Sequence, residues 1–454
     1  MRRWLRRAGI VLLALLAALA LLWSGSRLRG PTQVQRHALQ LMASSPQPEG
    51  RNAFPALWLL PYDVPNAEQE AVAAEDVERM RARLRSTADD PAEVGLIDLR
   101  TVAHERYRDL RPSDEDEKLF CRPRERDCLL RVRAAPDVYR ALAARNSRLF
   151  ERIEALSGYD HYRSLLPLRL EVPFPELQHG RALLTRHAVQ FVHGEVDAAL
   201  AGACRDVSTW RRLGGHSDSL VMRMIGIAYS TGAAGLLADM LAELPMDHPL
   251  PAGCAAAFEP PPAEELWLCE PMRGEFAYST GTVSALREAD DPASSVLDNL
   301  LWPVLLDVEM TRAEMAGSFA SFCAPEELQR VAADRAGAGA RQEPGLLRLE
   351  CVGNAVGCIL ANIAAPAYQP YQLRAQDHGA KLKLVATLLW LRAGGENRRP
   401  LAERIDRRPD AYKSPTREVE IAEDGRALRI QLFETGHGGY WQVPLPPDLQ
   451  EPAS

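Results

Sequence analysis

The alternation of apolar and polar positions divides the chain into segments, and the first segment is the most uniform. An apolar run extends from Ala8 to Trp23, with four arginines before it and two more after it. A helix rises ~1.5 Å per residue, so residues Ala8 to Ser26 cover ~28 Å, about one hydrocarbon core. Residues 1–30 are therefore predicted to form a basic cytoplasmic stub and a single transmembrane anchor. Because the basic residues before the apolar run should stay in the cytoplasm, we expect the rest of the chain to be exported.

The same run also fits a cleaved signal peptide, which has a basic start, an apolar middle and small residues at the cleavage point. Ser24, Gly25 and Ser26 offer such small residues. The run is long and rich in leucine, however, and Trp23 and Arg27 crowd the cleavage point. We therefore favour an uncleaved anchor that meets the membrane through residues Ala8 to Ser26.

Residues 31–65 are predicted to form a tether with a short helix at 34–42, followed by an aromatic segment. That segment, from Asn52 to Tyr62, is interrupted by prolines and is too short to span a bilayer. It could join a domain core or lie on the membrane surface, and we favour the core.

Residues 66–172 are predicted to form a helical region. Charged residues mark a solvated helix from Asn66 to Arg85, and Pro136 to Ser157 shows apolar residues at helical spacing before Gly158. Between these helices lies a polar stretch that contains Cys121 and Cys128.

Residues 173–395 are predicted to form a core of helical hairpins. Three helical patterns follow one another between Pro175 and Leu244, and their short connections predict antiparallel neighbours. Residues 245–291, from Pro245 to Asp291, are rich in proline and glycine and predict a long loop. The later helices are expected at these ranges: 296–315, 325–335, 346–364 and 371–393.

Residues 396–454 change to a two-residue period. Residues 417–421 and 428–432 alternate around Asp424-Gly425, which is a strong hairpin signal, and 440–443 could add a third strand. A lone hairpin is marginally stable, so we expect it to pack on a helix. The predicted fold is mainly α: a transmembrane helix, an exported bundle or solenoid of antiparallel helices, and a small C-terminal β-hairpin.

Composition supports a globular body. Of 454 residues, 46% are hydrophobic and 25% are charged, which is ordinary for a folded protein of this size. The net charge of −7 argues against a nucleic-acid partner, which would require a basic face.

Eight cysteines in an exported chain predict disulfides, although buried thiols are the alternative. Cys121 could pair with Cys128 across a polar loop, and Cys254 with Cys269 across a proline-rich segment. Cys351 and Cys358 fall within a predicted helix, where seven residues separate two Cα atoms by ~10 Å, beyond the ~7 Å limit of a disulfide. We therefore expect these two to pair elsewhere, for example with Cys204 or Cys323, or to remain thiols.

Histidines cluster at His179, His187 and His193, with Glu195 and Asp197 nearby. His179 and His187 lie ~12 Å apart on a helix, too far to share one metal ion. The sequence contains no HExxH, because His104-Glu105 leads to Arg108, and no paired CxxC. We expect no metal site.

The tetrapeptide from His216 to Ser219 contains the residue types of a nucleophilic site. Members of a catalytic triad meet in space rather than in a tetrapeptide, and we expect Ser217 or Asp218 to cap the following helix instead.

Glycine-rich stretches lack the strand and helix context of a phosphate loop. We expect close packing at Gly232–Gly235, a flexible link at Arg335–Arg341 and a turn at Gly436–Gly439, which includes His437. The acidic pairs Glu264-Glu265 and Asp290-Asp291 are expected to be solvated.

No residue is therefore predicted as catalytic, cofactor-binding or metal-binding. The favoured function is a periplasmic binding or scaffolding module, anchored in the inner membrane, with a protein partner. An envelope hydrolase whose site is assembled only in the fold is the first alternative, with His216 and residues 245–291 as the places to examine. A subunit of a larger inner-membrane assembly is the second, since small residues such as Ala14 and Ala18 allow close helix contact.

Overall fold

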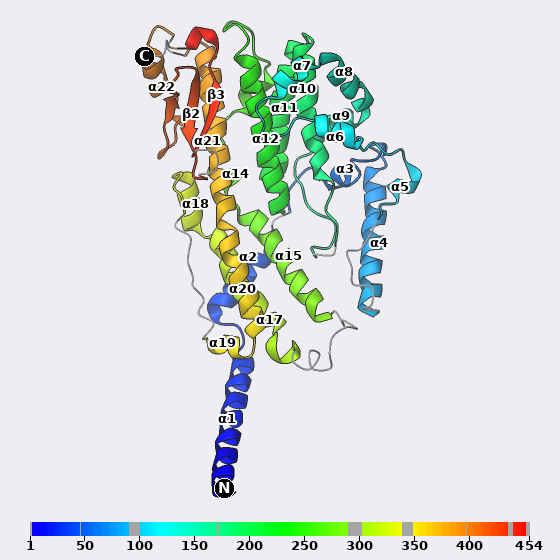
Figure 1. Ribbon diagram of the computed structural model, residues 1–454, viewed down its shortest axis with the longest axis vertical. Helices are drawn as coiled ribbons and strands as arrows, with labels where there is room; N and C mark the ends of the chain where they lie inside the picture. Colours follow the sequence, from blue (N-terminus) through cyan, green and yellow to red (C-terminus); the bar gives the residue numbers. More distant parts are fainter. Residues whose placement is uncertain are drawn as a thin grey trace.

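The computed structural model describes residues 2–45, 47–89, 100–169, 172–288, 302–337, 348–395, 397–434 and 439–450. The protein is mainly helical, with a small antiparallel sheet near the C-terminus. Helix α1 (Arg2–Arg29) projects from one end of the body (Figure 1). Its stretch Arg6–Arg29 is long and apolar enough to cross a membrane, and its most apolar window is fully exposed.

The N-terminal part of the body consists of short helices around a buried aromatic segment. They are α2 Gln33–Ala43, α3 Phe54–Trp58, α4 Gln69–Asp89, α5 Ala103–Arg106, α6 Asp114–Leu119, α7 Cys128–Ala134, α8 Pro136–Arg145 and α9 Ser147–Glu154. Phe54, Leu57 and Leu59 have no exposed surface, which confirms the core position of the aromatic segment. The predicted helix 136–157 breaks at Asn146, whose side-chain amide donates to Asp116 and to the Leu142 carbonyl.

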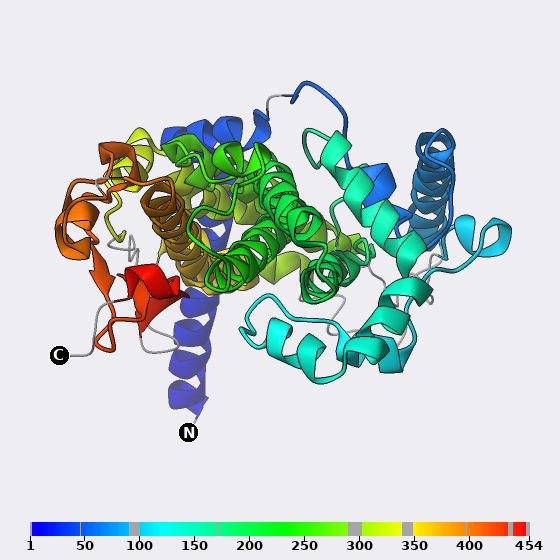
Figure 2. The same ribbon diagram turned by 90° about the horizontal axis from the view of Figure 1, so that it is seen from above.

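Three long helices form the centre: α10 (Ala182–Val192), α11 (Val196–Gly215) and α12 (Leu220–Leu241). The three predicted helices are therefore confirmed. Helices α11 and α12 cross closely, because a Cβ at Gly226 would lie 2.8 Å from the Cα of Gly214. From above, these green helices lie between α4 and the cyan helices on one side and the orange and red C-terminal elements on the other (Figure 2).

The long loop predicted at 245–291 is wrong for much of its length. It contains α13 (Gly253–Ala257), α14 (Ala263–Leu266) and the 20-residue helix α15 (Cys269–Glu288). Its glycines serve packing rather than flexibility. A Cβ at Gly274 would collide with the carbonyl of Asp218, and one at Gly281 with the carbonyl of Leu168.

The C-terminal helices are α17 Val308–Ala320, α18 Pro325–Ala332, α19 Leu349–Val352, α20 Ala355–Ala367, α21 Gln369–Arg392 and α22 Leu401–Asp406. The helix predicted at 296–315 begins outside the described residues, and α17 starts only after Asp307, whose side chain accepts from Met310 N. The helix predicted at 346–364 is divided into α19 and α20 by Gly353-Asn354.

The C-terminal sheet has three antiparallel strands in the order β1-β2-β3: β1 (Val419–Ile421), β2 (Ala427–Gln431) and β3 (Tyr440–Pro444). Leu428 is opposite Ile421 on one side and Val443 on the other. The predicted hairpin and its third strand are confirmed, and the sheet packs against α21 and α12.

Two hydrophobic cores lie at different distances from α1. The larger one, which we call the distal core, joins α3, α10–α12, α21 and the C-terminal sheet. The smaller proximal core, near the end of the body where α1 leaves, consists chiefly of side chains from α2, α15, α17 and α20, such as Met42, Phe276, Phe319 and Ala361 (Figure 1).

All eight cysteines form disulfides: Cys121–Cys128, Cys204–Cys254, Cys269–Cys323 and Cys351–Cys358. The first was predicted correctly. The expected Cys254–Cys269 pair is wrong, because each residue pairs instead with a distant helix or turn. The expectation that Cys351 and Cys358 do not pair is also wrong. The break at Gly353-Asn354 brings their Cα atoms to 5.7 Å.

Candidate functional site

The last turns of α1 are bound to the body through a joint of polar contacts. The Trp23 indole donates to the Val304 carbonyl (2.9 Å), and Arg27 forms an ion pair with Asp307 (3.1 Å). Ser26 is buried; its hydroxyl donates to the Glu350 carbonyl (3.2 Å) and accepts from the backbone N–H of Gly353 (3.0 Å). These contacts hold α1 directly on the body without a free linker.

The body residues that contact α1, Asp307 and Gly353, are positioned by their own local structure. One oxygen of Asp307 caps α17, which leaves the other oxygen directed at Arg27. On the other surface, a Cβ at residue 353 would lie 2.9 Å from the Ser26 hydroxyl, so only glycine allows this approach. The Cys351–Cys358 disulfide closes the turn that carries Gly353.

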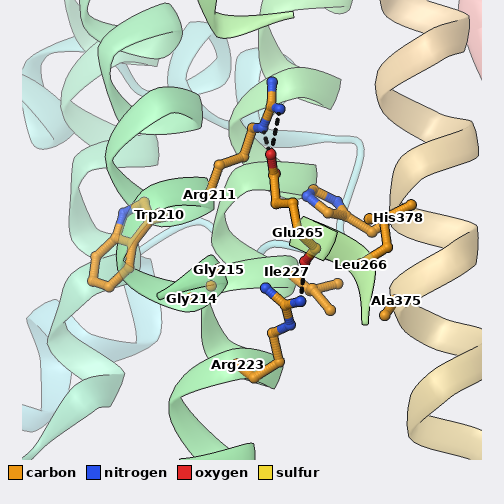
Figure 3. Close-up of a pocket in the computed structure, with 11 residues that line it drawn as sticks. Trp210, Arg211, Gly214, Gly215, Arg223, Ile227, Glu265, Leu266, Ala375 and His378 are labelled. Atoms are coloured by element: carbon orange, nitrogen blue, oxygen red, sulfur yellow. Dashed lines mark hydrogen bonds and ion pairs between the residues drawn. The ribbon is translucent and has the colours of Figure 1, made fainter. Parts of the chain in front are cut away.

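A second group of polar side chains surrounds a small cavity between α11, α12, α14 and α21 (Figure 3). Arg211 binds both carboxylate oxygens of Glu265 at 2.9 Å. Arg223 donates to the Glu265 carbonyl from the other side, and burial lowers the pKa of Arg223 to about 10. His378 points into the same space from α21.

His378 is held as a neutral ring. Its Nε2 lies 3.3 Å from the Ser230 hydroxyl, and its Nδ1 lies 3.2 Å from the Thr231 hydroxyl. Burial, and then the positive charges of Arg211 and Lys381, lower the pKa of His378 well below its usual value. The cavity itself has a volume of about 10 Å³, room for one water molecule at most. This cluster therefore fixes α14 to its neighbours and cannot hold a substrate.

A larger hollow, which we call the distal hollow, lies between α8, α9 and α10 and has a volume of about 320 Å³. It is lined by Arg140, Ala143, Ser147, Phe150, Glu151, Arg186, Val189, Gln190, His193 and Glu195. The lining contains apolar side chains together with positively and negatively charged ones. This composition suits a segment of a protein better than a compact ion of one charge.

One histidine in the distal hollow has an unused hydrogen-bond donor. Arg140 donates to Nδ1 of His193 (2.8 Å), so the ring proton of the neutral tautomer is on Nε2. Nε2 is buried and has no partner among the described residues. A buried donor without a partner is costly, but an acceptor from outside the chain could not reach Nε2 in this conformation.

The three histidines that cluster in the sequence are separated in the structure. His179 lies between Glu117 and Glu176, 3.1 Å from each, while His187 is hydrogen-bonded to Asp206 (3.0 Å). His187 is fully buried, and Gly202 packs against its ring, so this histidine–carboxylate pair is closed to solvent. Within the described residues, no three His, Cys, Asp or Glu side chains could hold a metal ion.

The tetrapeptide 216–219 forms a turn and a helix cap. The cap of α12 is Ser219, whose hydroxyl accepts from Met222 N, so the prediction of Ser217 or Asp218 was wrong by one or two residues. Ser217 instead accepts from Ser219 N, and His216 contacts a backbone carbonyl. Burial raises the pKa of Asp218 to about 6, with Arg163 opposing the shift. These contacts bring no base to the Ser217 hydroxyl.

Of the remaining residues singled out from the sequence, some serve packing or ion pairing and others lie outside the described residues. Gly232 packs closely, as predicted, because a Cβ there would lie 2.8 Å from Pro123. The prediction of a solvated Glu265 is wrong, since Arg211 binds it. Asp290-Asp291, His437 and residues 338–341 of the predicted flexible link lie outside the described residues.

Sequence reasoning missed Arg211, Arg223 and His378. Arg223 and His378 each interrupt an otherwise buried helix, which is the one sequence signal that could have revealed them.

Comparisons of the chain with family models, with curated proteins and with solved structures find no match. The function is therefore inferred from this chain's own geometry.

Proposed function

We propose that this chain is a single-pass protein of the inner membrane whose exported, bundle-like body binds a protein partner through the distal hollow. One observation carries the proposal: α1 leaves the body as a bare apolar helix with arginines at both ends, while its last turn is built into the body. An apolar helix of this length without protein contacts requires a bilayer around it.

The joint supports an uncleaved anchor rather than a signal peptide. Cleavage near Ser24–Ser26 would separate Trp23 from Val304 and disturb the buried Ser26. Cleavage after Ser26 would also leave the backbone N–H of Gly353 without the Ser26 hydroxyl that it contacts. The four disulfides support an exported body, because such bonds persist in oxidising compartments such as the periplasm.

The distal hollow supports the partner proposal. Its elements α8–α10 lie at the end of the body away from α1 (Figure 1), where a membrane around α1 leaves them accessible.

The anchor is tested by the mass and thiol content of protein from a bacterial membrane fraction that has been washed with carbonate. We expect a full-length mass and no free thiol under non-reducing conditions. A mass that begins near Arg27, or release by carbonate, contradicts the anchor.

The partner site is tested by a photo-crosslinking residue at Ser147, on the hollow, and at the exposed Val138 of the neighbouring helix α8, outside its lining. We expect a discrete adduct from Ser147 alone, and we expect R140E to reduce its yield at least several-fold. Equal labelling from both positions, or an adduct unaffected by R140E, contradicts a site in the hollow.

A further inference from the structure

The part of α1 that is free of the body is too short for a bilayer. Between Arg7 and the first body contact at Trp23 there are sixteen residue steps, or ~24 Å, whereas a hydrocarbon core needs ~30 Å. Arg27 lies ~6 Å further along the helix. The missing length therefore falls within the joint, where Val304 and Gly353 already contact α1.

The body segments that contact this part of α1 are residues 302–307 and 349–353, which we call the base. Three apolar side chains of the base are exposed although they lie within two residues of a contact with α1: Trp302 (38%), Val304 (39%) and Val352 (39%). Leu28, just beyond Arg27, is 86% exposed. Isolated exposed apolar residues are normal, but these all lie within two residues of a contact with the same end of α1 or on α1 itself.

The base also has the character of a membrane interface. Trp23 and Trp302 are of the residue type that is enriched at the level of lipid headgroups. Arg27 brings no unpaired charge to this level, because Asp307 neutralises it. Arg29 is exposed just beyond, where lipid phosphates could bind it.

We propose that the base is seated among the headgroups of the outer leaflet of the membrane that α1 spans, so that Trp302, Val304 and Val352 contact lipid. This inference rests on the proposed anchor. If the base enters the headgroup region by about one helical turn, α1 gains the length it needs to cross the hydrocarbon core. Lipid then also covers the exposed apolar side chains of the base. The bilayer would thus hold the body at two places, along α1 and beneath the base.

The test uses full-length protein in vesicles of phosphatidylethanolamine and phosphatidylglycerol. All native cysteines are paired, so one introduced cysteine is the only reactive thiol. V304C and L28C are labelled with an environment-sensitive fluorophore, and V138C, an exposed valine of the distal part, is the matched control. A non-reducing mass that shows four intact disulfides confirms the fold of each variant.

We expect spin-labelled lipid to quench the labels at 304 and 28 at least several-fold more strongly than the label at 138. Equal, weak quenching at all three positions in protein that resists carbonate extraction overturns the seating and leaves the anchor intact. Strong quenching at 28 with none at 304 also overturns it, since the base would then stand clear of lipid. Release of the protein by carbonate contradicts the anchor itself.

Discussion

The distal and proximal cores differ in what holds them together. The distal core is large, and buried ionic groups lie near it, among them Arg417, whose side chain is 2% exposed and paired with Asp334 and Asp377. The distal core contains the disulfides Cys121–Cys128 and Cys204–Cys254. The proximal core is much smaller, yet it also has two disulfides within or beside it, Cys269–Cys323 and Cys351–Cys358. Burial of apolar area stabilises a fold in proportion to that area. A region with little of it depends more on cross-links, which act mainly by restricting the unfolded chain.

The first prediction concerns the buried ion pairs of the distal core. Arg417 contacts Asp334 at 2.5 Å and Asp377 at 2.6 Å. R417A leaves two carboxylates without their cation, so we expect a loss of about 3–5 kcal/mol in the free energy of unfolding, measured in urea. R429A removes a partly exposed pair with Glu420 and should cost about 1 kcal/mol at most. Similar losses for the two variants would contradict the role of Arg417.

The second prediction compares one disulfide from each core. The Cys204–Cys254 and Cys269–Cys323 bonds close loops of 50 and 54 residues, so the chain-entropy contribution is about 4 kcal/mol for each. Replacing either pair with alanine should therefore lower global stability by similar amounts. Limited proteolysis should distinguish them: C269A/C323A should open α15 and α17 to cleavage, whereas C204A/C254A should leave α11 resistant. Equal resistance in both variants would remove the proposed difference between the cores.

The third prediction uses two glycines in different surroundings. A Cβ at Gly226 would lie 2.6 Å from the Trp210 carbonyl, at the crossing of α11 and α12, whereas Gly317 in α17 has nothing within 4 Å. We expect G226A to cost about 1–3 kcal/mol by overpacking. G317A should stabilise the protein by about 0.5–1 kcal/mol, because alanine favours the helix. Thermal unfolding of both variants checks the signs, and destabilisation by G317A would contradict the open packing around α17.

The fourth prediction is an opposite response of the two cores to pH. His378 has a lowered pKa when folded, so its contribution to stability is lost as the pH falls below its ordinary value of ~6.5. Burial raises the pKa of Glu275 in α15 to about 7, so its contribution is complete at acid pH and is lost as the pH rises from ~4.5 towards 7.

We expect each group to change the free energy of unfolding by up to ~1.4 kcal/mol per pH unit within its window. Urea titrations from pH 4.5 to 7.5 should show that E275Q removes the loss towards neutral pH, while H378Q removes the loss towards acid pH. Unchanged slopes in E275Q or H378Q would contradict the assignment of that residue.

Local patterns predicted the elements whose stability depends on neighbours in sequence. The central helices and the C-terminal sheet follow directly from spacing and from Asp424-Gly425. The breaks at Asn146 and at Gly353-Asn354 were missed, because the partners that stabilise them, such as Asp116, are distant in the chain. The helical spacing of apolar residues does not show where a contact with a distant residue ends the helix in place of a further turn.

The sites were less predictable than the fold for the same reason. Arg211 lies 54 positions from Glu265, and Arg417 lies 83 positions from Asp334, so no spacing links them. The Cys204–Cys254 and Cys269–Cys323 pairings likewise depend on which segments meet in space. The sequence did predict the apolar helix at the N-terminus, but not that its last turn is a fitted part of the body.

Under the anchor proposed above, the joint between α1 and the body would affect how the body meets a partner at the membrane. A body joined to its anchor by a flexible linker would sample all orientations, and binding would have to remove that orientational entropy. Here Ser26 and Arg27 tie the body to α1, so it turns with the helix and keeps the distal hollow at one height and tilt. For a proposed partner held in the same bilayer, the search would be reduced to lateral diffusion and rotation about one axis. Less orientational entropy is then lost on association, and a modest interface can suffice.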